Sequence, residues 1–333
     1  MLYCASFFAG VGGIDIGFEG YGNKKSDFFK VAYANEIDPF PIVTYELNSP
    51  DIEVDNRDIK DVVKDLEDNR NAIPNFQVML AGFPCQAFSI AGYRQGFNDE
   101  KGRGTLFFEL IKIIRIKKPD VVFLENVKNL VSHNNGDTFA TIIDALKKEG
   151  FNAPHYKVLN AMDYGNVPQN RERIYIVAFR NKEASTRFHF PNPIERNKQL
   201  SDIIDFNTKL NDKYYYTKGK YQGNIYEKLK NSVTSKNTVY QWRRHYVRQN
   251  MSGVIPTLTA NMGTGGHNVP LVFTDNGIRK LTPHECFNAQ GFPADFKLPS
   301  NMAESRIYKQ AGNSVCVSVI NKIALEIQKA LEG

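Results

Sequence analysis

Residues 2–13 have the sequence LYCASFFAGVGG, an apolar run that passes directly into a loop containing Gly10, Gly12 and Gly13. The apolar run predicts a short buried β-strand, and the glycines let a ligand approach the backbone with no Cβ in the way. The loop has neither the Gly-Lys-Ser/Thr of a phosphate loop nor the glycine spacing of a dinucleotide site, which favours a ligand without phosphates. Taken alone, the loop is equally compatible with a tight turn that binds nothing.

Short apolar runs followed by polar residues recur through the first half of the chain. Runs at residues 31–35, 78–82 and 121–124 predict further buried strands. A helix between two of them is predicted by apolar residues at helical spacing, namely Phe107, Leu110, Ile111 and Ile114. This alternation indicates an α/β fold with a parallel sheet, in which ligands bind beyond the carboxyl ends of the strands. The polar residues that follow the strands therefore predict one shared cleft.

The alternation is lost from about residue 181 to residue 277, which indicates a second, smaller domain. Tyrosines stand in a row at residues 214–216, basic residues are interspersed with aromatic ones at residues 240–246, and a glycine-rich turn occupies residues 262–267. After this segment, apolar residues at helical spacing predict a closing helix that contains Val319, Ile323, Ile327 and Leu331.

The composition is that of an ordinary globular protein, with 333 residues, of which 42% are hydrophobic and 23% charged. No apolar run reaches the roughly 18 residues of a membrane span, and residues 1–4 lack the basic start of a secretory signal. We therefore expect a cytoplasmic protein with no membrane partner. The net charge of +6 suits an anionic partner, but many proteins with this charge never bind nucleic acid.

The four cysteines, Cys4, Cys85, Cys286 and Cys316, lie far apart in the sequence. Zinc sites use closely spaced pairs, so we predict no metal. Cys85 follows Pro84 at the end of a predicted strand, a rigid and exposed place that suits a nucleophilic thiol. Without further context, an inert small hydrophobic residue is the more frequent state of a lone cysteine.

Acidic and basic residues complete the predicted cleft. Glu36 ends a strand where a carboxylate can accept hydrogen bonds from a ribose, and Asp58 is similar; a solvated acid is the alternative for both. Glu125 also ends a strand, where a partly dry cleft lets a carboxylate become protonated and act on a base nitrogen. Arg171 and Arg173 precede and enter an apolar strand, and alternate strand residues share a face, so both are expected to point into one cleft. A solvated charge cluster is the alternative.

Taken together and in this order, the motifs resemble the DNA cytosine-5 methyltransferase family. The order of Pro-Cys, Glu-Asn-Val and Gln-x-Arg-x-Arg, bracketed by the glycine loop and Gly-Asn-Ser-Val, is highly specific. The matching stretches are residues 8–13, 82–89, 103–108, 125–127, 169–175, 279–293 and 312–315. The resemblance implies a Rossmann-like methyltransferase sheet with a second, smaller target-recognition domain. It implies a catalytic domain at residues 1–200, target recognition at 201–278, a connecting segment at 279–311 and a C-terminal helix at 312–333 that completes the catalytic domain.

The resemblance also assigns chemistry. It makes Cys85 the nucleophile, Glu125 the partner of the cytosine N3 edge and Arg173 the contact to O2, with Arg171 nearer a phosphate. S-adenosylmethionine is the implied cofactor, surrounded by Phe8, Gly10, Gly12, Gly13, Glu36, Ile37, Asp58, Ile59, Pro84, Asn313 and Ser314. One familiar version of the family has tryptophan at the position of Ile37 to stack on adenine, so here only aliphatic contact is expected.

The implied substrate is a cytosine flipped out of a specific double-stranded DNA sequence, because carbon 6 is covered by stacking in a duplex. Residues 89–102 follow the nucleophile, are rich in glycine and charge, and are expected to form a mobile loop that closes over DNA; a plain surface connection is the alternative. The expected DNA contacts are Ser89, Arg103, Arg243, Arg244, Arg248, Gln249 and Thr257. Each arginine or glutamine is individually more typical of a phosphate or surface contact than of a base reader.

Further expectations concern the cellular setting. The resemblance implies the modification enzyme of a restriction-modification system, paired with a restriction endonuclease, monomeric, and associated with the nucleoid of a prokaryote. A tRNA cytosine-5 methyltransferase shares the catalytic motifs and stays open as an alternative substrate class. A non-catalytic DNA-binding relative is the second alternative, although it would not need Cys85, Glu125 and Arg173 together.

Overall fold

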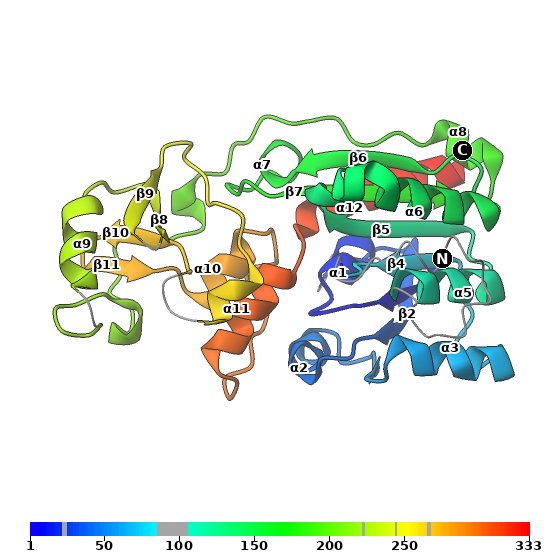
Figure 1. Cartoon of the computed structure of the whole chain (residues 1–333), viewed down its shortest axis with the longest axis horizontal. Coiled ribbons are helices and arrows are strands. Elements are labelled where there is room, and N and C mark those ends of the chain that lie inside the picture. The colour runs from blue at the N-terminus through cyan, green and yellow to red at the C-terminus, as the bar shows by residue number, and fades with distance from the viewer. Residues whose placement is uncertain (22–24, 85–105, 222–223, 244, 265–267) are drawn as a thin grey trace. The chain divides into compact units, whose positions relative to one another are not determined.

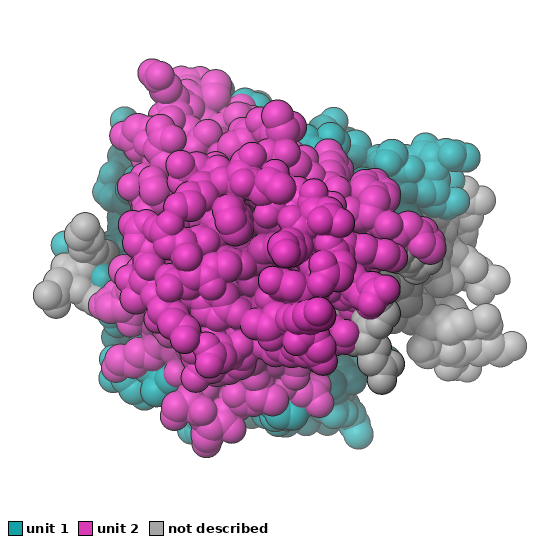
Figure 2. All heavy atoms as spheres, turned by 90° about the vertical axis from the view of Figure 1, so that its left-hand side faces the viewer, with its two compact units in different colours: residues 1–159, 172–191, 320–333 teal, residues 160–171, 192–319 magenta. Residues whose placement is uncertain are grey.

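The structure is a computed structural model that describes residues 1–21, 25–84, 106–221, 224–243, 245–264 and 268–333. It divides into two compact units, coloured separately in Figure 2. Unit 1 comprises residues 1–159, 172–191 and 320–333, and unit 2 comprises residues 160–171 and 192–319. Compared with the predicted domains, residues 160–171, 192–200 and 279–319 belong to unit 2 and not to the unit that contains the first strands.

Unit 1 is built on one seven-stranded sheet, as the α/β pattern predicts (Figure 1). The order across the sheet is β3-β2-β1-β4-β5-β7-β6, and neighbours from β3 to β5 pair in parallel, whereas β5 and β7 are antiparallel. The strands are β1 (Leu2–Phe7), β2 (Phe29–Asn35), β3 (Val54–Asp55), β4 (Val78–Ala81), β5 (Val121–Val127), β6 (His155–Asn160) and β7 (Glu172–Phe179). The predicted α/β sheet is confirmed, and it is parallel from β3 to β5.

The amphipathic helices α3 (Ile59–Asp68), α5 (Leu106–Lys117) and α6 (Asp137–Lys148) cover one face of this sheet (Figure 1). Their buried residues recur at helical spacing and pack into one core with alternate residues of the strands. Burying each such aliphatic or aromatic side chain contributes roughly 1.5–3 kcal/mol. The Asp58 carboxylate begins α3 by accepting a hydrogen bond of 3.0 Å from the backbone N–H of Lys60.

The C-terminal helix α12 (Val317–Glu332) crosses from unit 2 into unit 1 at residue 320. In unit 1 it packs against α1 (Gly13–Glu19), where a Cβ at Gly17 would come within 2.4 Å of Ile320 Cγ2. Asn321 Nδ2 also donates a hydrogen bond of 3.0 Å to the carbonyl of Gly17. Only glycine at position 17 allows this close approach, so α12 packs directly against the backbone of α1.

Unit 2 contains a four-stranded antiparallel sheet in the order β11-β10-β8-β9. Its strands are β8 (Val239–Arg243), β9 (Tyr246–Asn250), β10 (Leu271–Thr274) and β11 (Gly277–Lys280). Helix α9 (Ile225–Ser232) covers it through Leu229, which packs with Tyr216, Tyr240 and Leu271. On β11, the fully buried Arg279 donates two hydrogen bonds of 2.7 and 2.8 Å to the Glu285 carboxylate, which holds residues 279–285 within this unit.

The other helices connect these elements. The α-helices are α2 (Pro39–Asn48), α7 (Ala161–Tyr164), α8 (Lys182–Arg187), α10 (Pro283–Asn288) and α11 (Glu304–Asn313). Short 3-10 turns occupy residues 128–130, 133–136, 200–202, 212–214 and 260–264. Across the described residues, no helix is both long and apolar enough to cross a membrane.

Candidate active site

The glycine-rich loop after β1 has an unusual backbone in unit 1. Phe8, Gly10 and Gly12 have φ angles of 56°, 57° and 80°, in the left-handed region that L side chains seldom adopt. A Cβ added at Gly10 would meet nothing within 4 Å, so the backbone there opens onto free space. At Gly12 a Cβ would lie 2.9 Å from the Tyr45 ring, which makes glycine necessary for close packing.

Glu36 holds this loop from the end of β2. Its Oε2 accepts a hydrogen bond of 2.9 Å from the Gly10 N–H, and its Oε1 accepts one of 2.8 Å from the Asp38 N–H. Burial raises the pKa of the Glu36 carboxyl above its ordinary value, and the two N–H donors partly offset this effect. A carboxylate has about four acceptor positions, so Glu36 retains capacity for ligand hydroxyls.

The neighbouring residues predicted to surround the cofactor differ in their exposure. The Ile37 side chain is 57% exposed, so an apolar surface is available beside Glu36. Asp58 is half-buried and caps α3. Ile59 is only 3% exposed and its side chain packs in the core of unit 1, so it has no free face for a ligand.

Glu125 and Arg173 meet across β5 and β7. Glu125 stands opposite Tyr175, and Arg173, two residues before Tyr175, lies on the same face of β7. Arg173 Nε is 3.0 Å from Glu125 Oε1, and the two side chains are 12% and 10% exposed. Gly82, which follows β4, lies beside the carboxylate: a Cβ there would be 3.6 Å from Oε2, an ordinary contact distance. The pair is thus a partly dry donor and acceptor set.

Asn126 supports the segment that leads to Cys85. Its Nδ2 donates a hydrogen bond of 2.8 Å to the carbonyl of Phe83, which is itself 3% exposed. Pro84 follows as an exposed residue. Cys85, Ser89, Arg103, Arg244 and the predicted loop at residues 89–102 lie outside the described residues. Asn126 belongs to the Glu-Asn-Val motif, but the motif did not predict its hydrogen bond to Phe83.

Arg171 does not fit the predicted phosphate contact. It precedes β7 and belongs to unit 2, whereas Arg173 lies on β7 in unit 1. Its side chain is 2% exposed, and its guanidinium donates to the carbonyls of Leu258 at 2.7 Å and Gly312 at 3.1 Å, and to that of Ser314. Because β7 begins only at Glu172, the alternation of a strand does not place the two arginines on one face. Arg171 instead holds segments of unit 2 together.

The other two cofactor candidates also belong to unit 2. Asn313 is exposed at the end of α11, and Ser314 is 9% exposed. Within the described part of the chain, the buried Ser314 Oγ has no hydrogen-bond partner. A buried hydroxyl without a partner is costly, so a ligand that satisfied it would be favoured.

A polar groove of about 750 Å³ opens in unit 2. Four of the predicted DNA contacts line it: Arg243, Arg248, Gln249 and Thr257. Residues that were not predicted to contact DNA also line it, including Asn170, Gln241, Asn261 and Asn268. Gln241 stands opposite Arg248 in the β8–β9 pair, and Thr257 Oγ1 donates to the carbonyl of Asn170 at 2.7 Å.

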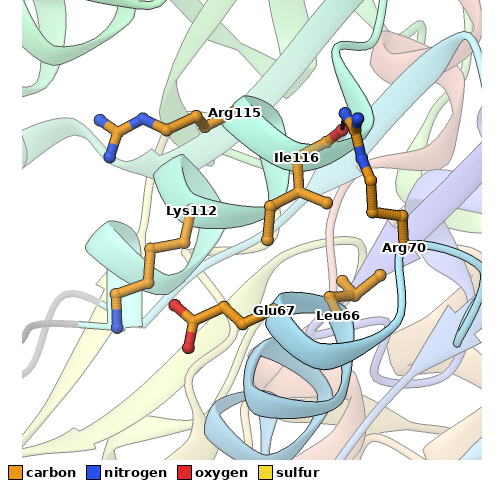
Figure 3. Close-up of a pocket in the computed structure, with 6 residues that line it drawn as sticks. All are labelled: Leu66, Glu67, Arg70, Lys112, Arg115 and Ile116. Atoms are coloured by element: carbon orange, nitrogen blue, oxygen red, sulfur yellow. Dashed lines mark hydrogen bonds between the residues drawn. The ribbon is translucent and has the colours of Figure 1, made fainter.

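A second pocket, of about 390 Å³, lies between the C-terminal halves of α3 and α5 (Figure 3). Its cations are already engaged within unit 1. Lys112 pairs with Glu109 at 3.1 Å, Arg115 pairs with Glu149 at 2.5 Å, and Arg70 donates to the carbonyl of Ile116 at 2.5 Å. This pocket therefore offers little net charge to an anion. Among the described residues, no group of three or more His, Cys, Asp or Glu side chains could hold a metal ion.

Comparisons with known proteins agree along the whole chain. Residues 2–329 match the family model described as C-5 cytosine-specific DNA methylase. The chain is 54% identical to the type II methyltransferase M.Bsp6I of Bacillus sp. (strain RFL6), covering 99% of this chain and 100% of that one. It is 37% identical to the type II methyltransferase M.HhaI of Haemophilus parahaemolyticus, covering 97% and 93%. A solved DNMT2 mutant of Spodoptera frugiperda has the same fold, with a TM-score of 0.70, 20% identity and coverage of 98% and 100%.

Proposed function

Since this chain belongs to the C-5 cytosine-specific DNA methylase family, we propose that Cys85, Glu125 and Arg173 carry out its chemistry. The protein is a DNA cytosine-5 methyltransferase that uses S-adenosylmethionine. The observation that carries the residue assignment is the Glu125–Arg173 pair of 3.0 Å. Asn126, the residue after Glu125, holds Phe83, which is two residues before Cys85. Glu125, Arg173 and the segment that precedes Cys85 are therefore connected through neighbouring strands of one sheet.

The residues around the glycine loop fit S-adenosylmethionine. Gly10 opens onto space that a Cβ would partly fill, and the exposed Ile37 offers apolar contact to an adenine ring. Glu36 has acceptor capacity for ribose hydroxyls, and the absence of a phosphate-binding signature suits a cofactor that lacks phosphates. When bound, the cofactor supplies an electrophilic methyl group.

The base requires activation because carbon 5 of cytosine is a poor nucleophile. Attack by the Cys85 thiolate forms a bond to carbon 6 and moves the electron pair of the C5=C6 bond into the ring, so that carbon 5 becomes nucleophilic. Glu125 hydrogen-bonds the N3 edge and Arg173 contacts O2, where negative charge develops. After methylation, loss of the carbon 5 proton to a base restores the C5=C6 bond and expels the thiolate. Water is a candidate for that base.

The groove of unit 2 supports recognition of double-stranded DNA. Exposed Arg243 and Arg248 can contact phosphates or guanine, and Gln249 can contact adenine. The reacting cytosine is flipped out, because its carbon 6 is otherwise covered by neighbouring bases. In this proposal unit 2 selects the sequence and unit 1 performs the chemistry.

The cellular role follows from the type II relatives. We propose that the enzyme is monomeric, acts on chromosomal DNA in the cytoplasm of a prokaryote, and protects that DNA from a companion restriction endonuclease. The 54% identity to a type II methyltransferase over the full length supports this setting.

Bisulfite sequencing of DNA from cells that express the protein tests the proposal. We expect 5-methylcytosine at every copy of one short sequence in cells with the wild-type protein and at none in cells with Glu125→Ala. An assay of purified enzyme on tRNA and duplex DNA, side by side, tests the alternative substrate. Methylation of tRNA but not of duplex DNA would overturn the DNA assignment, and modified DNA in the Glu125→Ala cells would overturn the role of Glu125.

A further inference from the structure

A buried polar cluster lies directly behind the glycine loop in unit 1. The Asp15 carboxylate, on α1, accepts a hydrogen bond of 2.5 Å from Ser6 Oγ through Oδ1 and one of 2.7 Å from the Tyr45 hydroxyl through Oδ2. All three residues are at most 4% exposed. The cluster thus joins the end of β1, the first turn of α1 and helix α2.

A buried carboxylate in this arrangement lowers the stability of the folded protein. A buried carboxylate is normally paired with a cation, but the described residues that bind Asp15 are two neutral hydroxyls. The titratable groups that interact electrostatically with it include Glu19 on the same helix and the Cys4 thiol of β1, and neither supplies a positive charge. An acid retained in such surroundings indicates a function beyond packing.

The contacts of Tyr45 connect the cluster to the loop. The Tyr45 ring packs against Gly12, where a Cβ would be only 2.9 Å from it. The Tyr45 hydroxyl donates to Asp15, which follows Gly12 by three residues. Glu36 binds the Gly10 N–H from the other side of the same loop. Phe8, at a φ of 56°, needs such supports because a non-glycine residue is strained in this region.

We propose that Tyr45 and Asp15 form a buried clamp that fixes the glycine-rich loop in the conformation that receives S-adenosylmethionine. Both are positioning residues, since neither needs to touch the cofactor. The inference rests on the proposed function, namely that this loop holds the cofactor. It adds a pair of residues 30 positions apart that determine how well the loop is preorganised.

The test measures the dissociation constant of S-adenosylmethionine by isothermal titration calorimetry at pH 8, with full-length Tyr45→Phe and a matched control. Tyr33→Phe is the control because its hydroxyl also donates a hydrogen bond of 2.7 Å to an aspartate, Asp55, but outside the glycine loop. We expect Tyr45→Phe to raise the dissociation constant on the order of tenfold, the effect of one hydrogen bond to a charged group. Tyr33→Phe should change it less than about twofold.

Two further variants separate the possible failures. Glu36→Ala removes the direct support of Gly10 and should weaken cofactor binding at least as much as Tyr45→Phe. If Glu36→Ala binds weakly while Tyr45→Phe behaves like Tyr33→Phe, the clamp is wrong and the cofactor site stands. If Glu36→Ala binds like the wild type, the loop is not the cofactor site and both proposals fall. Should Tyr45→Phe fail to fold, the isosteric Asp15→Asn replaces it, with the same expected loss and the same contradictory result.

Discussion

Arg173 Nε lies 3.0 Å from Glu125 Oε1 across two antiparallel strands, and both side chains are almost fully shielded from water. This relationship places a fixed positive charge beside a carboxylate at the edge of the sheet where the predicted nucleophile follows β4. Two polar side chains held side by side by neighbouring strands need little reorganisation when a base binds.

Glu125→Gln should separate catalysis from cofactor binding. The change keeps the size of the side chain but removes the acidic proton that the carboxyl group can donate to N3, so we expect kcat to fall by about a hundredfold or more. The dissociation constant of S-adenosylmethionine should change less than about threefold. Single-turnover methylation and calorimetry measure the two quantities. Glu172→Gln is the control. Glu172 lies on β7 next to Arg173, but its side chain is 41% exposed and pairs with Lys128 at 2.9 Å. Equal losses of rate and cofactor affinity would show that Glu125 acts on the cofactor.

Arg171 should behave as a structural residue, in contrast to Arg173. Arg171→Lys cannot reach all three carbonyls, and each buried carbonyl left without a donor costs about 1–3 kcal/mol. We expect a clear decrease in the free energy of unfolding, measured by urea denaturation. Arg173→Lys should have the smaller effect on stability and the larger one on kcat. If Arg171→Lys is as stable as the wild type and its DNA binding depends less on salt, Arg171 is a phosphate contact and not a structural residue.

Stability should depend on pH through Asp15. Burial raises the pKa of Asp15 from 3.8 to about 6 in the folded protein. A raised carboxyl pKa favours the folded state below pH 3.8, and this contribution is lost as the pH rises towards 6 and beyond. A shift of this size corresponds to about 3 kcal/mol. Asp15→Asn should therefore gain stability relative to the wild type between pH 4 and pH 8, measured by denaturant unfolding. A constant difference across this range would exclude titration of Asp15.

That stabilised Asp15→Asn protein should nevertheless bind S-adenosylmethionine more weakly, because the amide cannot accept both hydroxyl hydrogen bonds as the carboxylate does. Affinity of the wild type should also fall as the pH is lowered through about 6. The Glu36 carboxyl, whose pKa is also raised by burial, acts in the same direction. Calorimetry on both proteins at pH 5.5 and pH 8 distinguishes them: the Asn variant should show the smaller pH dependence. An identical pH dependence would assign the effect to Glu36 alone.

The groove of unit 2 should contain two kinds of contact. Losing a phosphate contact weakens binding to all sequences and reduces the salt slope by about 1, whereas losing a base contact costs about 1–3 kcal/mol at one base pair. Arg243→Ala and Arg248→Ala, measured against a set of duplexes at several salt concentrations, should each fall into one class. Lys329→Ala is the control, since it changes an equally charged residue on α12 in unit 1. No effect of either arginine on binding or salt dependence would remove the groove from the DNA interface.

Local sequence patterns predict much of this architecture. The strands, the glycine loop and Glu36 follow from short-range alternation, because a buried strand and the turn after it are fixed by adjacent residues. Arg171 was misplaced because its partners, Leu258 and Gly312, are far away in the sequence and no local pattern reveals them. The Asp15–Tyr45 hydrogen bond was not predicted for the same reason, since the two residues are 30 positions apart. Residues 279–311 were predicted only as a connecting segment. The buried Arg279–Glu285 pair, which no local pattern reveals, helps to hold the start of this segment in unit 2.

The division between recognition and chemistry can be tested by exchange. Replacing residues 201–277 with the corresponding segment of a relative that methylates a different sequence should transfer the target while the rate per site stays comparable. Bisulfite sequencing of DNA from cells that express the chimera identifies the modified sequence. Continued methylation of the original sequence would place specificity outside this segment.

The most direct test of the account is covalent trapping on a duplex with 5-fluorocytosine at the target position, in the presence of S-adenosylmethionine. Fluorine cannot leave carbon 5 as the proton does, so the bond from the thiolate to carbon 6 persists. We expect the wild-type protein to give an adduct that survives denaturing electrophoresis, and Cys85→Ala to give none, whereas Cys316→Ala should still be trapped because Cys316 is buried at 1% exposure. A denaturant-resistant adduct with Cys85→Ala would contradict the assignment of Cys85 as the nucleophile.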